Sequence, residues 1–121
     1  MNCTLRVATA GRSFIVKQGR PFVEKYPHIA APPDRTRVEA SFYRAAARCP
    51  AASAHMPALL DADGDARIVV LDDLGEARDF TDLYAGAVIS PAESATLVEY
   101  LLTIHRCEVP RGDRVVADDD E

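Results

Sequence analysis

The segment SFIVKQGRPFVEKYP, residues 13–27, decides how the first part of this chain folds. A short apolar run ends at Lys17, and the chain then leaves through Gly19 and Pro21. Together with CTLRVAT, residues 3–9, the run predicts an antiparallel hairpin that turns at Gly11. Lys17 is then either the solvated side chain of a strand or a cation held on a strand to receive an anion. Four prolines between residues 19 and 33 predict a loop without regular structure.

A helix is predicted next, over residues 35–49, with Asp34 as its N-cap and Pro50 closing it. Four of its apolar residues recur at helical spacing and predict the face that packs on the protein core. These residues are Val38, Phe42, Ala45 and Cys49.

The second half predicts a hairpin and a long helix. Residues 58–74 indicate two strands joined by a tight turn at Asp63 and Gly64, and the apolar run at 67–71 indicates a central strand covered on both faces. Ser90 and Glu93 form a capping-box pattern around Pro91, so a helix begins there. The predicted fold class is α+β, a small antiparallel sheet of about four strands with a crossing helix and a C-terminal helix.

Composition narrows the classes of function. The chain has 121 residues and a net charge of −5, which disfavours a nucleic-acid partner. No apolar run is long enough to span a membrane, and the polar start predicts a cytoplasmic location. Cys3, Cys49 and Cys107 are an odd number and lie far apart, which predicts reduced thiols rather than a disulfide or a zinc site.

Lys17 and Glu39 are the two charges most relevant to function. If the helix at 35–49 packs on the sheet, the two side chains can face each other and form a partly buried pair. Protein kinases hold a strand lysine on a helix glutamate in this manner, and the lysine then contacts phosphate. The alternative is that both residues are ordinary solvated surface groups.

Five stretches, in order along the chain, resemble the N-terminal lobe of the aminoglycoside phosphotransferase and methylthioribose kinase family: FIVKQ, DRTRVEASFYR, MPALLDAD, IVVLDDLG and LVEYLLTIHR. The resemblance implies that Lys17 contacts the phosphates of ATP and that Glu39 is its partner. It also implies that the LDDL stretch is the hinge between lobes, where the Asp72 carbonyl and the Leu74 amide bind the adenine edge. Ile15 and Val70 would form one apolar wall for the ring.

The chain also departs from that family. No glycine-rich stretch precedes the first predicted strand, and none of the three histidines begins a His-x-Asp catalytic loop. We therefore expect a truncated kinase-like lobe over residues 1–106 and an acidic, disordered tail over 107–121. The lobe alone would be inactive, would bind ATP weakly and would hold no Mg²⁺ by itself.

A non-enzymatic role is the alternative. A kinase lobe without the C-lobe exposes the apolar surface that the C-lobe covers, so it can form a homodimer or dock on another protein. The apolar side chains of the last predicted helix would make that contact: Leu97, Leu101, Leu102 and Ile104.

Overall fold

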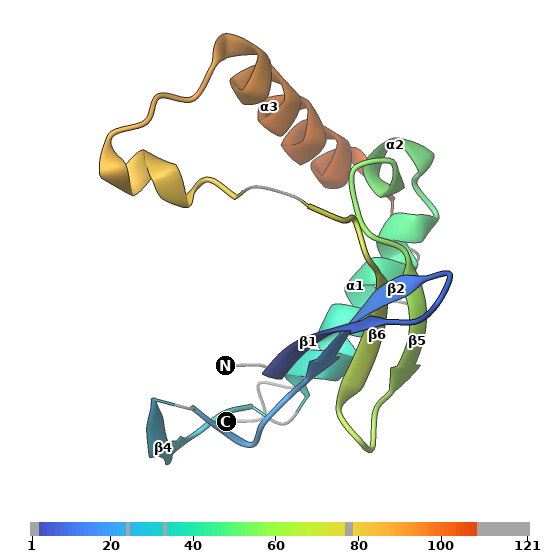
Figure 1. The fold of residues 1–121 in the computed structure, drawn as a ribbon. Coiled ribbons are helices and arrows are strands. Elements are labelled where there is room, and N and C mark those ends of the chain that lie inside the picture. Colours follow the sequence, from blue (N-terminus) through green and yellow to red (C-terminus); the bar gives the residue numbers. More distant parts are fainter. Residues whose placement is uncertain (1–2, 24, 33, 77–78, 109–121) are drawn as a thin grey trace.

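The computed structural model describes residues 3–23, 25–32, 34–76 and 79–108 (Figure 1). It is an α+β fold, as predicted, with one four-stranded antiparallel sheet and a separate two-stranded one. In chain order the elements are β1 (Cys3–Ala8), β2 (Ser13–Gln18), β3 (Phe22–Val23), β4 (Tyr26–Ala30), α1 (Arg35–Ala47), α2 (Pro50–Ser53), β5 (Leu59–Asp63), β6 (Ile68–Asp72), the 3₁₀ helix η1 (Thr81–Ala85) and α3 (Pro91–Arg106).

The main sheet has the strand order β1-β2-β6-β5, and β6 is a central strand as predicted. Side chains along β6 alternate in burial: Val69 and Leu71 are 0% and 3% exposed, whereas Val70 is only partly buried. The prediction that this strand is covered on both faces is therefore wrong. Helix α1 packs on one face, and the residues that point to the other face keep contact with solvent.

The region between β2 and α1 contains regular structure that was not predicted. β3 and β4 pair as a short antiparallel hairpin, and the Ala31 amide donates to the Pro21 carbonyl at 3.0 Å. The prolines predicted a loop because they lack an amide proton. A two-stranded ribbon has an unpaired outer edge on each strand, so Pro27 in β4 needs no ladder partner there.

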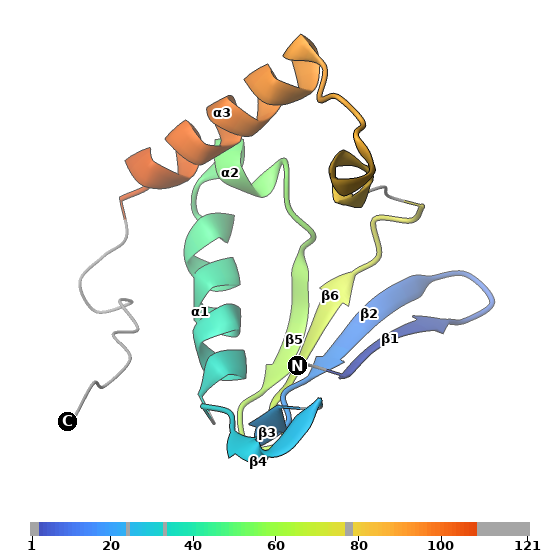
Figure 2. The ribbon, with the colours of Figure 1, turned by 90° about the vertical axis from the view of Figure 1, so that its left-hand side faces the viewer.

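Helix α1 lies along β5 and β6 (Figure 2), but it turns a different face to the sheet from the predicted one. Its buried residues are the small ones: Thr36, Ala40 and Ala46. Val38 and Phe42 are 37% and 44% exposed, so the predicted packing face is wrong. Small side chains allow the helix to approach the strands closely, which leaves the larger apolar residues outside. Asp34 precedes the helix as expected, but its side chain makes no capping hydrogen bond.

Helix α3 begins where predicted. The Glu93 amide donates to Ser90 Oγ at 3.2 Å, and the Ser90 amide donates to Glu93 Oε2 at 2.8 Å, which completes the capping box. None of the residues of α3 is fully buried by the described part of the chain, and Val98 and Leu101 are more than half exposed.

A disulfide between Cys49 and Cys107 joins the C-terminal ends of α1 and α3, with the two Cα atoms 6.1 Å apart. The prediction of reduced thiols is wrong for these two residues, while Cys3 is free. The 58 residues that separate the cysteines in sequence hid this pairing, because only the fold brings the two helix ends together.

None of the helices in the described ranges is long and apolar enough to cross a membrane.

Candidate functional site

The predicted contact between sheet and helix is present. Lys17 Nζ donates to Glu39 Oε1 at 2.6 Å, and the side chains are 28% and 23% exposed. Lys17 lies opposite Val69 in the β2–β6 ladder, so it points to the face that α1 covers. Glu39 lies on the sheet-facing side of α1, next to the buried Ala40. The pair is thus set by strand register and helix phase, and it remains open to solvent on one side.

Tyr43 lies beside this pair and was not predicted. Burial raises the pKa of its hydroxyl above the ordinary value of 10.0, while the charge of Lys17 lowers that pKa and the charge of Glu39 raises it. Tyr43 follows Glu39 by one helical turn, so a search for residues at that spacing on the helix would have identified it. The raised pKa keeps the hydroxyl neutral at physiological pH.

Ile15 and Val70 do not form one wall. Ile15 lies opposite Leu71 in the ladder and shares the face of Lys17, whereas Val70 lies opposite Val16 on the other face. The expected apolar wall is therefore wrong. Side chains alternate between the two faces along a strand, and Val70 is one position away from Leu71, the residue of β6 that faces the same side as Ile15. Ile15 remains with Lys17, and Leu71 is the apolar residue of β6 on that side.

The predicted hinge follows β6 and is fixed to β1. Arg6 Nε lies 2.9 Å from Asp73 Oδ2, and the same guanidinium donates to the Gly75 carbonyl at 2.8 Å. The Gly75 amide donates to Asp73 Oδ1 and is the main cause of the lowered pKa of that carboxyl. These contacts hold the backbone of the segment from Asp72 to Gly75 in place. Neither Arg6 nor Asp73 was predicted, because the contact joins residues 67 apart.

Leu74, whose amide was expected to bind adenine, extends from this segment with 63% exposure. Among the described residues, no acceptor is found for its backbone amide. The structure therefore brings Lys17, Glu39 and Ile15 to one face of the sheet and leaves Asp72 and Leu74 at the end of the adjacent strand.

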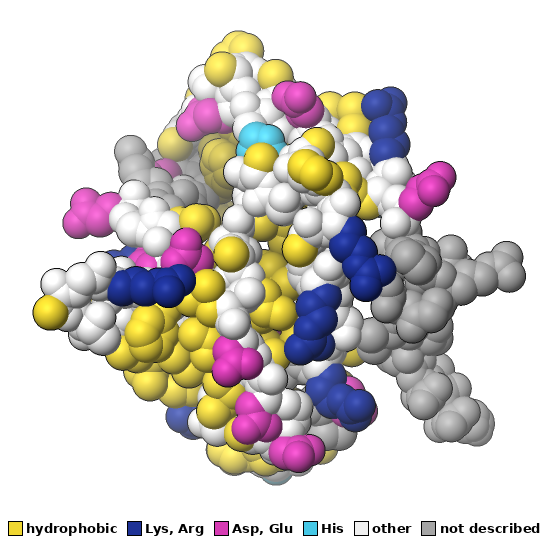
Figure 3. All heavy atoms as spheres, turned by 90° about the vertical axis from the view of Figure 1, so that its right-hand side faces the viewer, with side chains coloured by type: hydrophobic (Ala, Val, Ile, Leu, Met, Phe, Trp, Pro, Cys, Tyr) yellow, Lys and Arg dark blue, Asp and Glu magenta, His cyan; other side chains and the backbone are white. Residues whose placement is uncertain are grey.

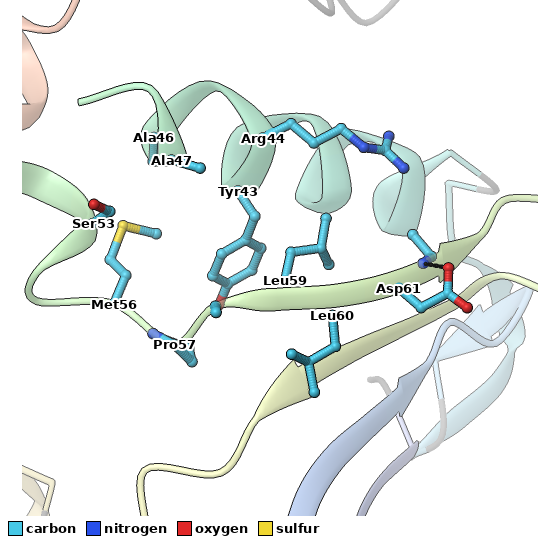
Figure 4. Close-up of a pocket in the computed structure, with 12 residues that line it drawn as sticks. Tyr43, Arg44, Ala46, Ala47, Ser53, Met56, Pro57, Leu59, Leu60 and Asp61 are labelled. Carbon is cyan, nitrogen blue, oxygen red and sulfur yellow. Dashed lines mark hydrogen bonds between the residues drawn. The ribbon is translucent and has the colours of Figure 1, made fainter. Parts of the chain in front are cut away.

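An apolar hollow of about 540 Å³ lies on the other side of α1, between that helix, α2 and β5. Figure 3 shows this face: basic side chains run in a line on one side of an apolar recess, and acidic side chains lie on the other. The close-up in Figure 4 shows Tyr43 and Leu59 entering the space between helix and strand. None of the predicted site residues lines this hollow, but Tyr43 does, and Tyr43 also adjoins the ion pair.

Metal-binding side chains do not gather in the described ranges, where no group of three or more His, Cys, Asp or Glu is placed to hold an ion. Asp61, Asp63 and Asp65 alternate through the β5–β6 hairpin, but Asp63 accepts the amides of Asp65 and Ala66 at 2.9 Å, as in a turn.

Comparison with known proteins found no match for the chain among family models, curated proteins or solved structures.

Proposed function

We propose that this chain is a nucleotide-binding lobe of a small-molecule kinase, in which Lys17 contacts the phosphates of ATP. The observation that carries the proposal is the Lys17–Glu39 ion pair between a strand of the sheet and the helix that crosses it. Protein kinases hold their phosphate-binding lysine by a strand-to-helix pair of this kind. The resemblance of the five sequence stretches points to the aminoglycoside phosphotransferase and methylthioribose kinase family.

The chemistry of the pair suits phosphate binding. An ammonium has three donors, and Glu39 accepts from one of them at 2.6 Å. The Lys17 side chain is about one-quarter exposed, so it can reach a ligand while the carboxylate fixes its position. A fixed ammonium in a partly desolvated place attracts a phosphate oxygen more strongly than a mobile lysine in open water.

The adenine ring would lie toward the hinge. In the proposal Ile15 contacts the ring from the face that it shares with Lys17, and the Leu74 amide and the Asp72 carbonyl bind the adenine edge. Val70 is left out of this arrangement because it lies on the opposite face. The acceptor would be a hydroxyl of a sugar, an aminoglycoside or a related metabolite.

Phosphoryl transfer needs more than a lysine clamp. It also needs a base that orients the attacking hydroxyl and carboxylates that hold Mg²⁺. The sequence contains no His-x-Asp segment. We therefore propose that these residues bind ATP weakly, without an Mg²⁺ site of their own, and transfer no phosphate by themselves.

Isothermal titration calorimetry with ATP tests the proposal, and the chain provides a matched control. Lys17 and Lys25 are the two lysines in the sequence. Losing one charge-assisted hydrogen bond costs about 1.5–3 kcal/mol, so Lys17→Met should weaken binding by roughly ten- to a hundredfold. Lys25→Met should leave it unchanged. Equal losses in both variants, or binding that survives Lys17→Met, would contradict the role of Lys17.

A homodimer or a docking module is the second candidate function, and helix α3 favours it. Its apolar residues Leu97, Val98, Leu101 and Leu102 are 36%, 55%, 53% and 48% exposed, which is unusual for an amphipathic helix in a monomer. Sedimentation at several concentrations distinguishes the two candidates. A dimer that Val98→Asp dissociates and that ATP does not affect favours association as the function, whereas a monomer that ATP stabilises favours nucleotide binding.

A cytoplasmic location, with neither nucleic acid nor membrane as a partner, remains part of the proposal. The acidic net charge of −5 supports the exclusion of a nucleic-acid partner. The Cys49–Cys107 disulfide argues against the cytoplasm, where thiols are normally kept reduced. Counting the free thiols of protein purified from its native compartment tests the location. Three free thiols would indicate a reducing compartment, and one free thiol would indicate an oxidising compartment.

A further inference from the structure

Helix α3 has little packing to hold it on the rest of the fold. None of its residues is fully buried by the described part of the chain, and its main packing partner is the short helix α2. Figures 1 and 2 show α3 beyond the end of α1 and apart from the sheet. A segment with few buried contacts has a low free energy of local opening. The position of α3 therefore depends on something besides core packing.

The Cys49–Cys107 disulfide supplies the missing attachment. It fixes the C-terminal end of α3 to the end of α1, with the Cα atoms 6.1 Å apart. The noncovalent contact beside the disulfide is small. Tyr100 and Ile104 are partly buried, and the Tyr100 ring meets the His55 ring edge-on with the centroids 6.1 Å apart. The covalent bond is thus the strongest of the described links between α3 and the corner formed by α1 and α2.

We propose that this disulfide is a redox switch. In the oxidised chain it holds α3 against α2, and its reduction releases α3 while the sheet and α1 keep their fold. None of the fully buried apolar residues in the described ranges belongs to α3, so the core does not need that helix. These residues are Ala31, Ala40, Ala46, Ala52, Val69 and Leu71. The switch requires neither ATP binding nor association of the chain.

The chemical step is thiol–disulfide exchange with a dithiol reductant. A thiolate of the reductant attacks one sulfur, forms a mixed disulfide and displaces the other cysteine as a thiolate. The second thiol of the reductant then displaces the remaining cysteine. Two electrons and two protons pass to the protein, which gains two thiols, and the reductant leaves as a disulfide. Cys49 and Cys107 are only partly buried, so a reductant can reach the bond.

Release changes both the order and the surface of α3. A helix of 16 residues without packing is only marginally stable in water. Tyr100 and Ile104 become accessible, in addition to Val98 and Leu101, which are already more than half exposed. Residues 109–121, most of the tail that was expected to be disordered, lie outside the described ranges, and the proposal does not involve them.

Nuclear magnetic resonance on the full chain, with and without dithiothreitol, tests the proposal. On reduction the nuclear Overhauser contact between the His55 and Tyr100 rings should disappear. The α3 amides should lose roughly tenfold or more of their exchange protection relative to the amides of β6, whose chemical shifts should not change. Cys49→Ser with Cys107→Ser should reproduce the reduced spectrum without reductant. Cys3→Ser is the matched control, since it removes the free thiol and should leave the switch intact.

A count of free thiols, rising from one to three, shows when reduction is complete. A ring contact that persists at three thiols would show that packing alone holds α3, which would overturn the proposal. Loss of the β2 and β6 signals in the reduced chain would overturn it too, because the disulfide would then be needed by the whole fold. Oxidised glutathione should restore the contact in the reduced chain, and a contact that does not return would exclude a reversible switch.

Discussion

Breaking the Lys17–Glu39 pair gives the strongest test of how the sheet and helix α1 are held together. Lys17→Met keeps most of the side-chain volume and removes the ammonium. Glu39→Gln keeps the shape and removes the carboxylate. Each single change leaves the other charge about one-quarter exposed and without its 2.6 Å partner. The double variant removes both charges together.

The expected loss of unfolding free energy follows from how deeply the pair is buried. Exposed ion pairs contribute about 0–1 kcal/mol, and removing one partner from a fully buried pair costs about 3–5 kcal/mol. Side chains that are 28% and 23% exposed fall between these limits. We expect each single variant to lose about 1–2 kcal/mol of unfolding free energy, or roughly 5–10 °C in Tm. The double variant should lose less than the sum, with a coupling energy of about 1 kcal/mol.

Urea unfolding of the four proteins in this cycle measures the coupling energy. The Asp34–Arg37 pair is the matched control, since it is 3.4 Å long and its side chains are 68% and 65% exposed. The cycle of Asp34→Asn and Arg37→Met should give less than about 0.5 kcal/mol. If the Lys17–Glu39 coupling is no larger than this control value, the pair is an ordinary surface contact and the reasoning is refuted.

Three further predictions concern other parts of the fold. Ser90→Ala removes the capping acceptor of α3 and should lower the unfolding free energy by about 1 kcal/mol. Amide exchange should become faster in the first turn of α3 but not in α1. Unchanged exchange in α3 would show that the cap does not stabilise the start of that helix. Reduction of the Cys49–Cys107 disulfide should lower the unfolding free energy by about 4 kcal/mol, from the chain entropy of a 58-residue loop, and denaturation curves that coincide with and without reductant would contradict this. Because the pKa of Tyr43 is raised, the folded state keeps the phenol protonated, so the unfolding free energy should fall as pH rises above about 10. Tyr43→Phe should flatten this decline. An identical pH profile in the variant would show that Tyr43 does not cause the decline.

Local patterns predicted much of the fold. Alternation and turn residues gave the β1–β2 and β5–β6 hairpins, and the capping box placed the start of α3. The Lys17–Glu39 contact was one of two alternatives for these residues, and the resemblance to the kinase family favoured it over two solvated side chains. These features depend on neighbouring residues or on one simple packing assumption.

Other features depend on long-range geometry that no local pattern contains. Periodicity identified an apolar face on α1, but Ala40 and Ala46 face the sheet while Phe42 remains exposed. The register of β2 on β6 separated Val70 from Ile15, and a single-residue shift would have united them. The disulfide and the Arg6–Asp73 contact each join residues more than fifty positions apart.

The position of Lys17 relative to bound nucleotide can be observed directly, because the sequence contains two lysines and each gives its own signal. In protein labelled with ¹³Cε-lysine, the Lys17→Met and Lys25→Met variants assign the two resonances. During an ATP titration the Lys17 signal should shift and saturate at the affinity found by calorimetry, while the Lys25 signal stays in place. A Lys17 signal that does not move while ATP binds, or that shifts no more than the Lys25 signal, would contradict the nucleotide-binding account.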